Sequence, residues 1–404
     1  MKLLFLLTQD LESPSGLGRY WPLARALAGR GHEVRIAALH SMWDTLQQKH
    51  FVRDGVTIDY VAPMHVIKYS NQKMYYPPMK LLGVSLAATL ALSRAAFSSK
   101  VDIIHIGKPH PMNSIAGWLA MRVKRIPMGV DCDDYEASSN RFSGRWQQEV
   151  VEYFEKRVPR SAGFVTTNTH YMQSMLLSWG CPVERIFYIP NGVERERFKP
   201  PKPDEINQLR TNLGLNGKRV VLYAGSLSLS SHPVELLLRA FALLYPNYPD
   251  TVLLLVGGGE DYQNLKDQTR SLGIHQATFF AGRVDPDQMP GYYHLAEVSV
   301  DPVKDDEAAR GRSPLKLFES WACGVPFVSG EVGDRPYLVG TPPAGLLVKH
   351  AGDAQALADG ICQILDNPDL AQELRERGLE RVANYFWDYL AEKMEHVYQL
   401  TLSG

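Results

Sequence analysis

The chain has few cysteines and almost no net charge. Its four cysteines, Cys132, Cys181, Cys323 and Cys362, are widely spaced and form no C-x-x-C pair, which argues against a zinc site and a disulfide framework. A formal net charge of -1 and the lack of a long basic run argue against a nucleic-acid partner. These absences fit a protein of the reducing cytoplasm, and we expect a cytoplasmic location.

The sequence also lacks a long uninterrupted apolar run. The longest, residues 81–93, is shorter than the about 20 residues that span a bilayer. The apolar start at residues 3–7 runs into Gln9-Asp10-Leu11-Glu12 without a cleavage-like region, so it predicts a buried first strand and not a signal peptide. We therefore expect a soluble globular protein.

What the chain does contain is short apolar strands that alternate with amphipathic helices, in two halves. Strands are predicted at residues 3–7, 34–39, 102–106, 128–131 and 164–166, and again at 220–224, 252–256, 278–280, 298–300 and 326–328. This alternation is typical of doubly wound parallel sheets, and 404 residues exceed what one core usually serves. We predict an α/β fold with Rossmann-like domains at residues 1–193 and 218–384, joined by a Pro-rich and charged linker at 194–217.

The run from Ser313 to Val328 combines a helix start, a single carboxylate and a buried strand. Pro314 suits the first helical position and Ser313 the cap before it, and the free backbone N–H groups there attract phosphate. Lys316 adds a positive charge at the same end. Glu319 lies farther along, where its carboxylate would accept both hydroxyls of a ribose.

In the first half, a loop with Gly16 and Gly18 follows the first strand. The two glycines permit a close backbone approach, and the helix after them offers N–H groups to an anion. The loop lacks the third glycine and the later acidic residue of a dinucleotide fingerprint, so a nicotinamide-dependent dehydrogenase fits poorly.

Four carboxylates cluster where a later strand of this half ends, in Asp131-Cys132-Asp133-Asp134-Tyr135-Glu136. Because crowded acids repel, at least one should have a raised pKa or a hydrogen-bonded partner. Asp133 is therefore either a functional residue or part of a solvated loop that caps the next helix. A Mg²⁺ site is conceivable from the carboxylates, but nothing else in the chain requires one.

The run from Ser313 to Val328 resembles the donor-site signature of retaining glycosyltransferases of family four, which have the GT-B fold. The resemblance extends, in order along the chain, to the glycine loop, Pro190-Asn191-Gly192-Val193, Tyr223-Ala224-Gly225-Ser226, Gly257-Gly258-Gly259 and Gly282-Arg283-Val284. It implies two Rossmann-like domains with a cleft between them, and an aromatic helix at residues 385–404 that packs back on the first domain.

The resemblance also implies an activity. The protein would move a sugar, with retention, from a nucleoside diphosphate sugar to a hydroxyl of a glycan, a lipid-linked sugar or a small molecule. It would need no metal and no cofactor. A sugar-nucleotide epimerase or hydrolase on the same frame, and a noncatalytic nucleotide-sugar-binding scaffold, are the alternatives.

Site residues follow from the matching positions. Asp133, Lys316 and Glu319 are the predicted catalytic residues, and His110 and Asp134 the predicted acceptor contacts. The predicted donor contacts are Gly16, Gly18, Gly225, Ser226, His232, Gly258, Arg283, Val284, Arg310, Gly311, Arg312, Ser313 and Leu315.

The chain departs from the family pattern at four of these positions. Gly311 replaces a second glutamate, Ser226 an arginine and His232 a lysine, while Asp133 stands where family members often have histidine. The basic residues at 310, 312 and 316 are candidates to replace the lost cations.

Basic and aromatic residues precede the apolar stretch of residues 81–93. Such a mixture can dock a protein on an anionic membrane surface. Peripheral contact with the inner membrane face and a solvated loop are both consistent with it. The residues are Lys68, Tyr69, Lys73, Tyr75, Tyr76 and Lys80.

Overall fold

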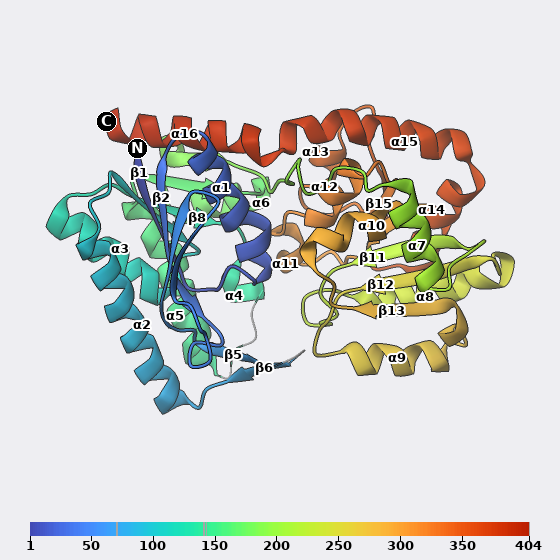
Figure 1. Ribbon diagram of the computed structural model, residues 1–404, viewed down its shortest axis with the longest axis horizontal. Coiled ribbons are helices and arrows are strands. Elements are labelled where there is room, and N and C mark those ends of the chain that lie inside the picture. Colours follow the sequence, from blue (N-terminus) through green and yellow to red (C-terminus); the bar gives the residue numbers. More distant parts are fainter. Residues whose placement is uncertain (70–71, 140–141, 143, 404) are drawn as a thin grey trace. The chain divides into compact units, whose positions relative to one another are not determined.

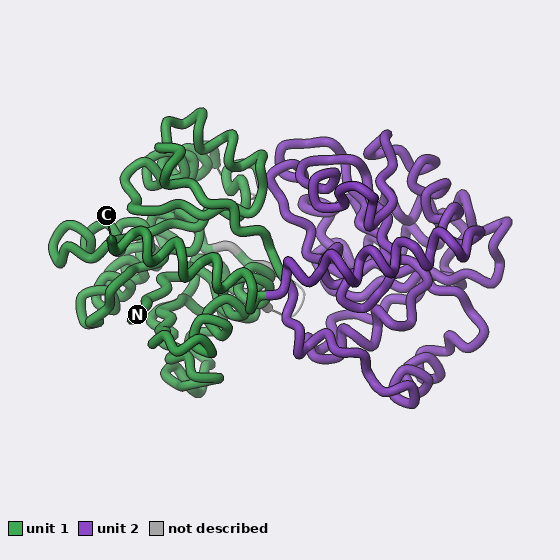
Figure 2. Tube along the Cα trace, turned by 90° about the horizontal axis from the view of Figure 1, so that it is seen from above, with its two compact units in different colours: residues 1–192, 387–404 green, residues 193–386 purple. Residues whose placement is uncertain are grey.

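The chain forms two compact units in the computed structural model, which describes residues 1–403 except 70–71, 140–141 and 143 (Figure 1). The first unit contains Met1–Gly192 and Trp387–Gly404, and the second contains Val193–Phe386 (Figure 2). Residues 194–217 therefore belong to the second unit and do not form a separate linker. The reason is α7 (Pro203–Asn212), which begins with Pro203 at its first turn and packs Ile206 and Leu209 against the core of that unit.

Among the described residues, the first unit has an eight-stranded sheet in the order β10-β9-β8-β7-β1-β2-β4-β3. Its neighbouring strands are parallel except for β3, which is antiparallel to β4. The strands are β1 (Lys2–Leu7), β2 (Glu33–His40), β3 (His50–Arg53), β4 (Val56–Pro63), β7 (Ile103–Gly107), β8 (Met128–Cys132), β9 (Phe164–Thr167) and β10 (Ile186–Tyr188), with a separate hairpin of β5 (Val66–Tyr69) and β6 (Gln72–Tyr75).

Two apolar layers cover this sheet, because successive side chains of a strand point to opposite faces. Leu4 and Leu6 of β1 pack with α2 and α3, whereas Phe5 and Leu7 pack with α1 and α16. Tyr398 of α16 is fully buried, and its hydroxyl lies 2.7 Å from His105 Nδ1. The helices are η1 (Gly16–Tyr20, a π-helix), α1 (Trp21–Gly29), α2 (Pro78–Ser98), α3 (Pro111–Lys124), α4 (Glu136–Ser139), α5 (Arg145–Ser161), α6 (His170–Ser178), η2 (Val183–Arg185, a 3₁₀ helix) and α16 (Trp387–Ser403).

The second unit repeats this plan with a six-stranded parallel sheet in the order β13-β12-β11-β14-β15-β16. Its strands are β11 (Arg219–Ala224), β12 (Thr251–Val256), β13 (Thr278–Gly282), β14 (Val298–Asp301), β15 (Phe327–Gly330) and β16 (Leu346–Val348). Its α-helices, besides α7, are α8 (Val234–Leu244), α9 (Tyr262–Ser271), α10 (Met289–His294), α11 (Glu307–Arg310), α12 (Leu315–Ala322), α13 (Arg335–Val339), α14 (Ala354–Asp366) and α15 (Pro368–Arg381). The predicted α/β class is confirmed, with one doubly wound sheet in each unit.

Each sheet has one strand at which the winding changes direction. β1 lies between β2 and β7, and β11 lies between β12 and β14. In open parallel sheets, ligands bind beyond the carboxyl ends of the strands at such a switch point. The first unit has Thr8 and Lys108 there, directly after β1 and β7, and the second has Gly225 and Asp301.

Helix α2 is longer than the apolar stretch at residues 81–93 suggests. It has 21 residues, is long and apolar enough to cross a membrane by length and composition, and buries 22% of its most apolar window. The expectation that this stretch is too short is therefore wrong for the helix as formed, which starts at Pro78 and continues to Ser98.

Candidate active site

The acidic residues at the end of β8 and directly after it form two separate sets of contacts. Asp131 is buried and forms a two-pronged ion pair with Arg19, with both N···O distances at 2.6 Å, and it accepts a further bond from Thr166 Oγ1. Arg19 also donates to the carbonyl oxygen of Ile189 and to Asn191 Oδ1. Burial alone would raise the pKa of Asp131, but the Arg19 guanidinium outweighs it and the pKa lies below its usual value.

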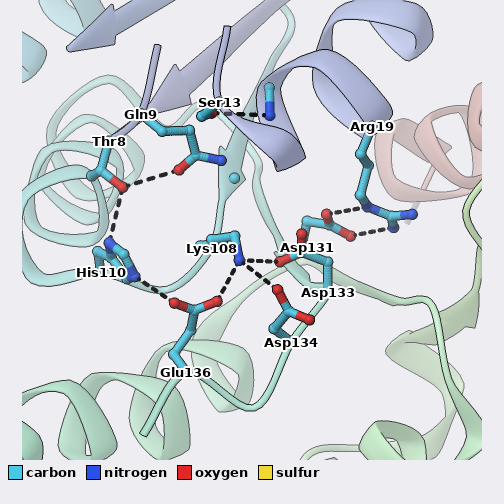
Figure 3. Close-up of polar contacts among 12 residues, drawn as sticks. Thr8, Gln9, Ser13, Arg19, Lys108, His110, Asp131, Asp133, Asp134 and Glu136 are labelled. Carbon is cyan, nitrogen blue, oxygen red and sulfur yellow. Dashed lines mark hydrogen bonds and ion pairs between the residues drawn. The ribbon is translucent and has the colours of Figure 1, made fainter. Parts of the chain in front are cut away.

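The other three carboxylates surround Lys108. Its Nζ lies 3.3 Å from Asp133 Oδ1, 2.9 Å from Asp134 Oδ2 and 2.5 Å from Glu136 Oε1 (Figure 3). Lys108 has a left-handed backbone with φ 62°, a conformation that a lysine rarely adopts, and it is held there by a bond from its N–H to the Asp131 carbonyl. Backbone strain of this kind often occurs at functional sites.

The network continues from Glu136 to the loop after β1. His110 Nε2 lies 3.0 Å from Glu136 Oε2, and His110 Nδ1 lies 2.9 Å from Thr8 Oγ1. The Thr8 hydroxyl also lies 3.4 Å from Gln9 Oε1. Figure 3 shows this chain of contacts, which we call the Lys108 network, from Gln9 at one end to Asp133 and Asp134 at the other.

Asp133 is 4% exposed, which does not fit the interpretation as a solvated loop residue. Burial raises its pKa to about 8, the Lys108 ammonium opposes this rise, and the nearby Asp134 adds to it. The sequence predicts that at least one acid of the cluster has a raised pKa, and Asp133 meets that expectation.

Three carboxylates within reach of one another invite comparison with a metal site. Ligand oxygens of Asp133, Asp134 and Glu136 all lie within 4.8 Å of one another. The Lys108 ammonium contacts all three of these side chains, so a positive charge of the protein already stands where a cation would bind. The set therefore fits a divalent ion poorly.

The glycine loop after β1 is closely packed. A Cβ atom on Gly16 would lie 2.2 Å from the Asp10 carbonyl oxygen, so a side chain does not fit there. Gly16 and Gly18 both belong to the π-helix η1, which also contains Arg19, the ion-pair partner of Asp131. The predicted acceptor contacts His110 and Asp134 both belong to the Lys108 network.

In the second unit, a buried ion cluster joins β14 to the start of α12. Asp301 Oδ1 lies 3.2 Å from Lys316 Nζ, and Asp301 Oδ2 accepts a 2.7 Å bond from Arg335 Nη2. Burial alone would raise the pKa of Asp301, but Lys316 and Arg335 hold it well below its usual value. Lys316 therefore pairs with Asp301, and Glu319, three residues farther along the same helix, is not its partner.

A second cation lies beside the start of α8. Arg312 Nη1 donates a 2.7 Å bond to the Ser231 carbonyl oxygen and lies 3.2 Å from His232 Nδ1. Burial, Lys316 and Arg312 together keep the pKa of His232 well below its usual value. The ring is therefore neutral, and because Nδ1 faces an N–H donor, its proton lies on Nε2.

Glu319 is half-buried on α12 and is fixed by one hydrogen bond. Its Oε2 accepts a 2.8 Å bond from the buried hydroxyl of Tyr293. Burial raises its pKa, while Arg197 and the Tyr293 bond oppose the rise. In the described part of the chain, Oε1 makes no hydrogen bond.

The remaining predicted donor contacts vary in position. Gly225 lies against Lys316, since a Cβ there would be 2.8 Å from Lys316 Cε, and the Gly258 carbonyl accepts from Leu227 N. Arg310 pairs with Asp305 at the surface, with N···O distances of 2.7 and 2.9 Å. Of the others, Ser226, Val284, Leu315 and His232 are half-buried, Arg283 is exposed, and Gly311 and Ser313 are buried.

Sequence reasoning missed several residues of these clusters. Lys108 and Asp301 stand directly at the ends of β7 and β14, so the strand-end rule that selects the glycine loops also selects them. Gln9, which follows β1, is selected by the same rule. Arg335 and Tyr293 carry no local signal, since only the fold brings them to the cluster.

Two family models match the chain, one for each unit. "Glycosyl transferase 4-like domain" matches residues 15–192, and "Glycosyl transferases group 1" matches residues 205–381. The chain belongs to the glycosyltransferases of family four. The family predicted from the run at Ser313 to Val328 is thus confirmed.

Relatives in this family carry related names. A D-inositol 3-phosphate glycosyltransferase of Acidothermus cellulolyticus is 29% identical, with 98% of this chain and 89% of the relative covered. A GDP-mannose-dependent alpha-(1-6)-phosphatidylinositol monomannoside mannosyltransferase of Mycolicibacterium smegmatis is 28% identical, but the match covers 55% of this chain and only 58% of that relative.

Solved structures confirm the fold. Sucrose-phosphate synthase from Thermosynechococcus elongatus superposes with a TM-score of 0.81 at 22% identity and covers all of both chains. Anabaena HepE in complex with UDP-glucose gives 0.74 at 20% identity, covering 99% of this chain and all of the other. The glycosyltransferase therefore has the GT-B fold.

Proposed function

We propose that this glycosyltransferase moves a sugar from a nucleoside diphosphate sugar to a hydroxyl acceptor, with retention of the anomeric configuration and without a metal ion. The observation that carries the proposal is the pair of cations, Lys316 and Arg312, beside the switch point of the second sheet. A leaving nucleoside diphosphate gains negative charge as the glycosidic bond breaks, and preplaced cations stabilise that charge.

Arg312 would compensate for the cations that Ser226 and His232 do not supply. Its guanidinium lies against Ser231 and His232, close to a position where family members have lysine. The neutral His232 ring would add an Nε2–H donor for a phosphate oxygen. This arrangement supports an active enzyme over a noncatalytic scaffold.

Glu319 would hold the ribose. Tyr293 fixes the carboxylate through Oε2, which leaves Oε1 to accept from the sugar hydroxyls. The complexes of Anabaena HepE with UDP and with UDP-glucose support a nucleotide-sugar donor for the shared fold.

We also propose that the enzyme is cytoplasmic and makes peripheral contact with an anionic membrane face. Exposed apolar side chains at Met79, Leu82, Leu86 and Leu90 follow helical spacing along α2. Lys80 adds a positive charge at the start of the same helix, with its Nζ over the Tyr76 ring. The side chains of Lys68, Tyr69, Lys73 and Tyr75 lie outside the described residues.

A turnover assay tests the reaction. UDP-glucose, GDP-mannose and ADP-glucose are incubated with candidate acceptors in the presence of EDTA, and nucleoside diphosphate release and the anomeric configuration of the product are measured. We expect release that depends on the acceptor, a retained configuration and no loss with EDTA. Product formed without any acceptor would favour the epimerase or hydrolase alternative, and donor binding without turnover would favour the scaffold.

A further inference from the structure

Two buried polar atoms at the ends of the Lys108 network have no hydrogen-bond partner among the described residues. One is Nε2 of Gln9, a residue that is 7% exposed, and the other is Oδ1 of Asp133, which faces the Lys108 ammonium at 3.3 Å without a hydrogen bond. Leaving a buried polar atom unpaired is costly, so such atoms indicate a ligand that completes them.

The two atoms are complementary in kind. The Gln9 amide nitrogen can only donate, whereas Asp133 Oδ1, which faces the Lys108 ammonium, acts as an acceptor. Both residues stand at the carboxyl edge of the first sheet, after β1 and β8, beside the switch point between β1 and β7. A sugar or polyol carries several hydroxyls, each of which can donate one hydrogen bond and accept others, so such a molecule can satisfy both atoms.

The charges of this edge argue against an anionic ligand. Lys108 is bound to three carboxylates, and Arg19 is bound in two-pronged fashion to Asp131. Asp10 and Glu12 add further carboxylates on the loop after β1. Each buried cation described at this edge is thus already neutralised, and a phosphate group would meet mainly negative charge.

We propose that Gln9 and Asp133 bind hydroxyls of an uncharged polyol or sugar acceptor, and that this edge disfavours a phosphate ester on the ring that enters it. The inference rests on the proposed transfer reaction and names its acceptor class. It also separates this chain from its relatives that are named for D-inositol 3-phosphate, a compound that carries a phosphate.

The experiment compares matched acceptors and a single changed residue. With the donor that the wild type uses, initial rates are measured for myo-inositol against D-inositol 3-phosphate and for D-glucose against D-glucose 6-phosphate. We expect each neutral member to react at least roughly tenfold faster than its phosphate ester. Gln9→Glu, which replaces the donor by an acceptor, should raise the acceptor KM by roughly tenfold, the effect of about one lost hydrogen bond, with donor binding unchanged.

Gln47→Glu, the same change at an exposed position of the first unit, should leave the acceptor KM unchanged and serves as the control. Faster reaction of a phosphate ester, no reaction of either neutral member, or an unchanged acceptor KM in Gln9→Glu would each overturn the inference. Donor titration of the same proteins distinguishes the two levels. If the wild type binds no nucleotide sugar, the proposed function has failed, and if it binds the donor but prefers phosphate esters, only this inference has failed.

Discussion

Lys108 shows what a single residue can do at the end of a strand. It follows β7, adopts a left-handed backbone and brings one ammonium to Asp133, Asp134 and Glu136. The acidic run is visible in the sequence, and its crowding predicts a raised pKa for at least one of its carboxyl groups. The partner was not, because Lys108 lies about 25 positions earlier and only the parallel pairing of β7 with β8 brings the two segments together.

The titration of Asp133 contributes a pH dependence to the free energy of unfolding. Its folded pKa of about 8 exceeds the value of about 3.9 expected for an unfolded chain, so the folded protein holds a proton that the unfolded chain releases. Stability from this group is present below about pH 4 and is lost as the pH rises to 8. We expect the thermal midpoint of Asp133→Asn to fall less between pH 5 and pH 8 than that of the wild type.

The matched control is Asp102→Asn, an exposed carboxylate at the other end of the same sheet that accepts a bond from Lys2 N. This variant should keep the wild-type pH slope. Identical slopes for Asp133→Asn and the wild type, measured by circular dichroism, would show that Asp133 does not titrate in this range.

At the scale of elements, strands with a continuous apolar run were predictable, and strands without one, including the eight-residue β4, were not. All ten strands predicted from apolar runs are present. The strands β10 and β16 have only three residues each, too few for a pattern, and they form because an open sheet edge is available beside β9 and β15. Helix α12 begins at Leu315, one residue after the predicted start, with Pro314 as its cap residue.

The exposed apolar face of helix α2 predicts that the protein binds to membranes. Its exposed face carries Leu86 and Leu90, which are 57% and 71% exposed, and such a face is expected to enter the headgroup region of a membrane. Wild-type protein should sediment with vesicles of anionic phospholipid, and the double variant Leu86→Glu with Leu90→Glu should not.

The control is Leu243→Glu, which places the same charge on an exposed leucine of the other unit. It should sediment like the wild type. A wild type that stays in the supernatant, or a double variant that sediments fully, would remove the membrane from the account.

At the scale of the whole molecule, the order of motifs carried the family assignment. The glycine loop with Gly16, the Gly225 turn and the α12 run follow one another in the order that the family has, and the two family models cover the same halves. The division of the chain was less predictable, since residues 194–217 look like a linker but fold as part of the second unit. Composition alone does not show that a segment rich in proline and charge is folded, because two apolar residues, Ile206 and Leu209, are enough to pack it against the core of the second unit.

The central claim is that the second unit binds a nucleoside diphosphate sugar through the start of α12. Isothermal titration of the preferred donor into the wild type, Lys316→Gln and Glu319→Ala tests it most directly, with Lys218→Ala, an exposed lysine beyond the opposite end of β11, as the control. Lys316→Gln can still bond to Asp301 but loses its charge. We predict that both α12 variants bind the donor at least roughly tenfold more weakly while Lys218→Ala binds like the wild type. Equal affinity of all four proteins would contradict the account.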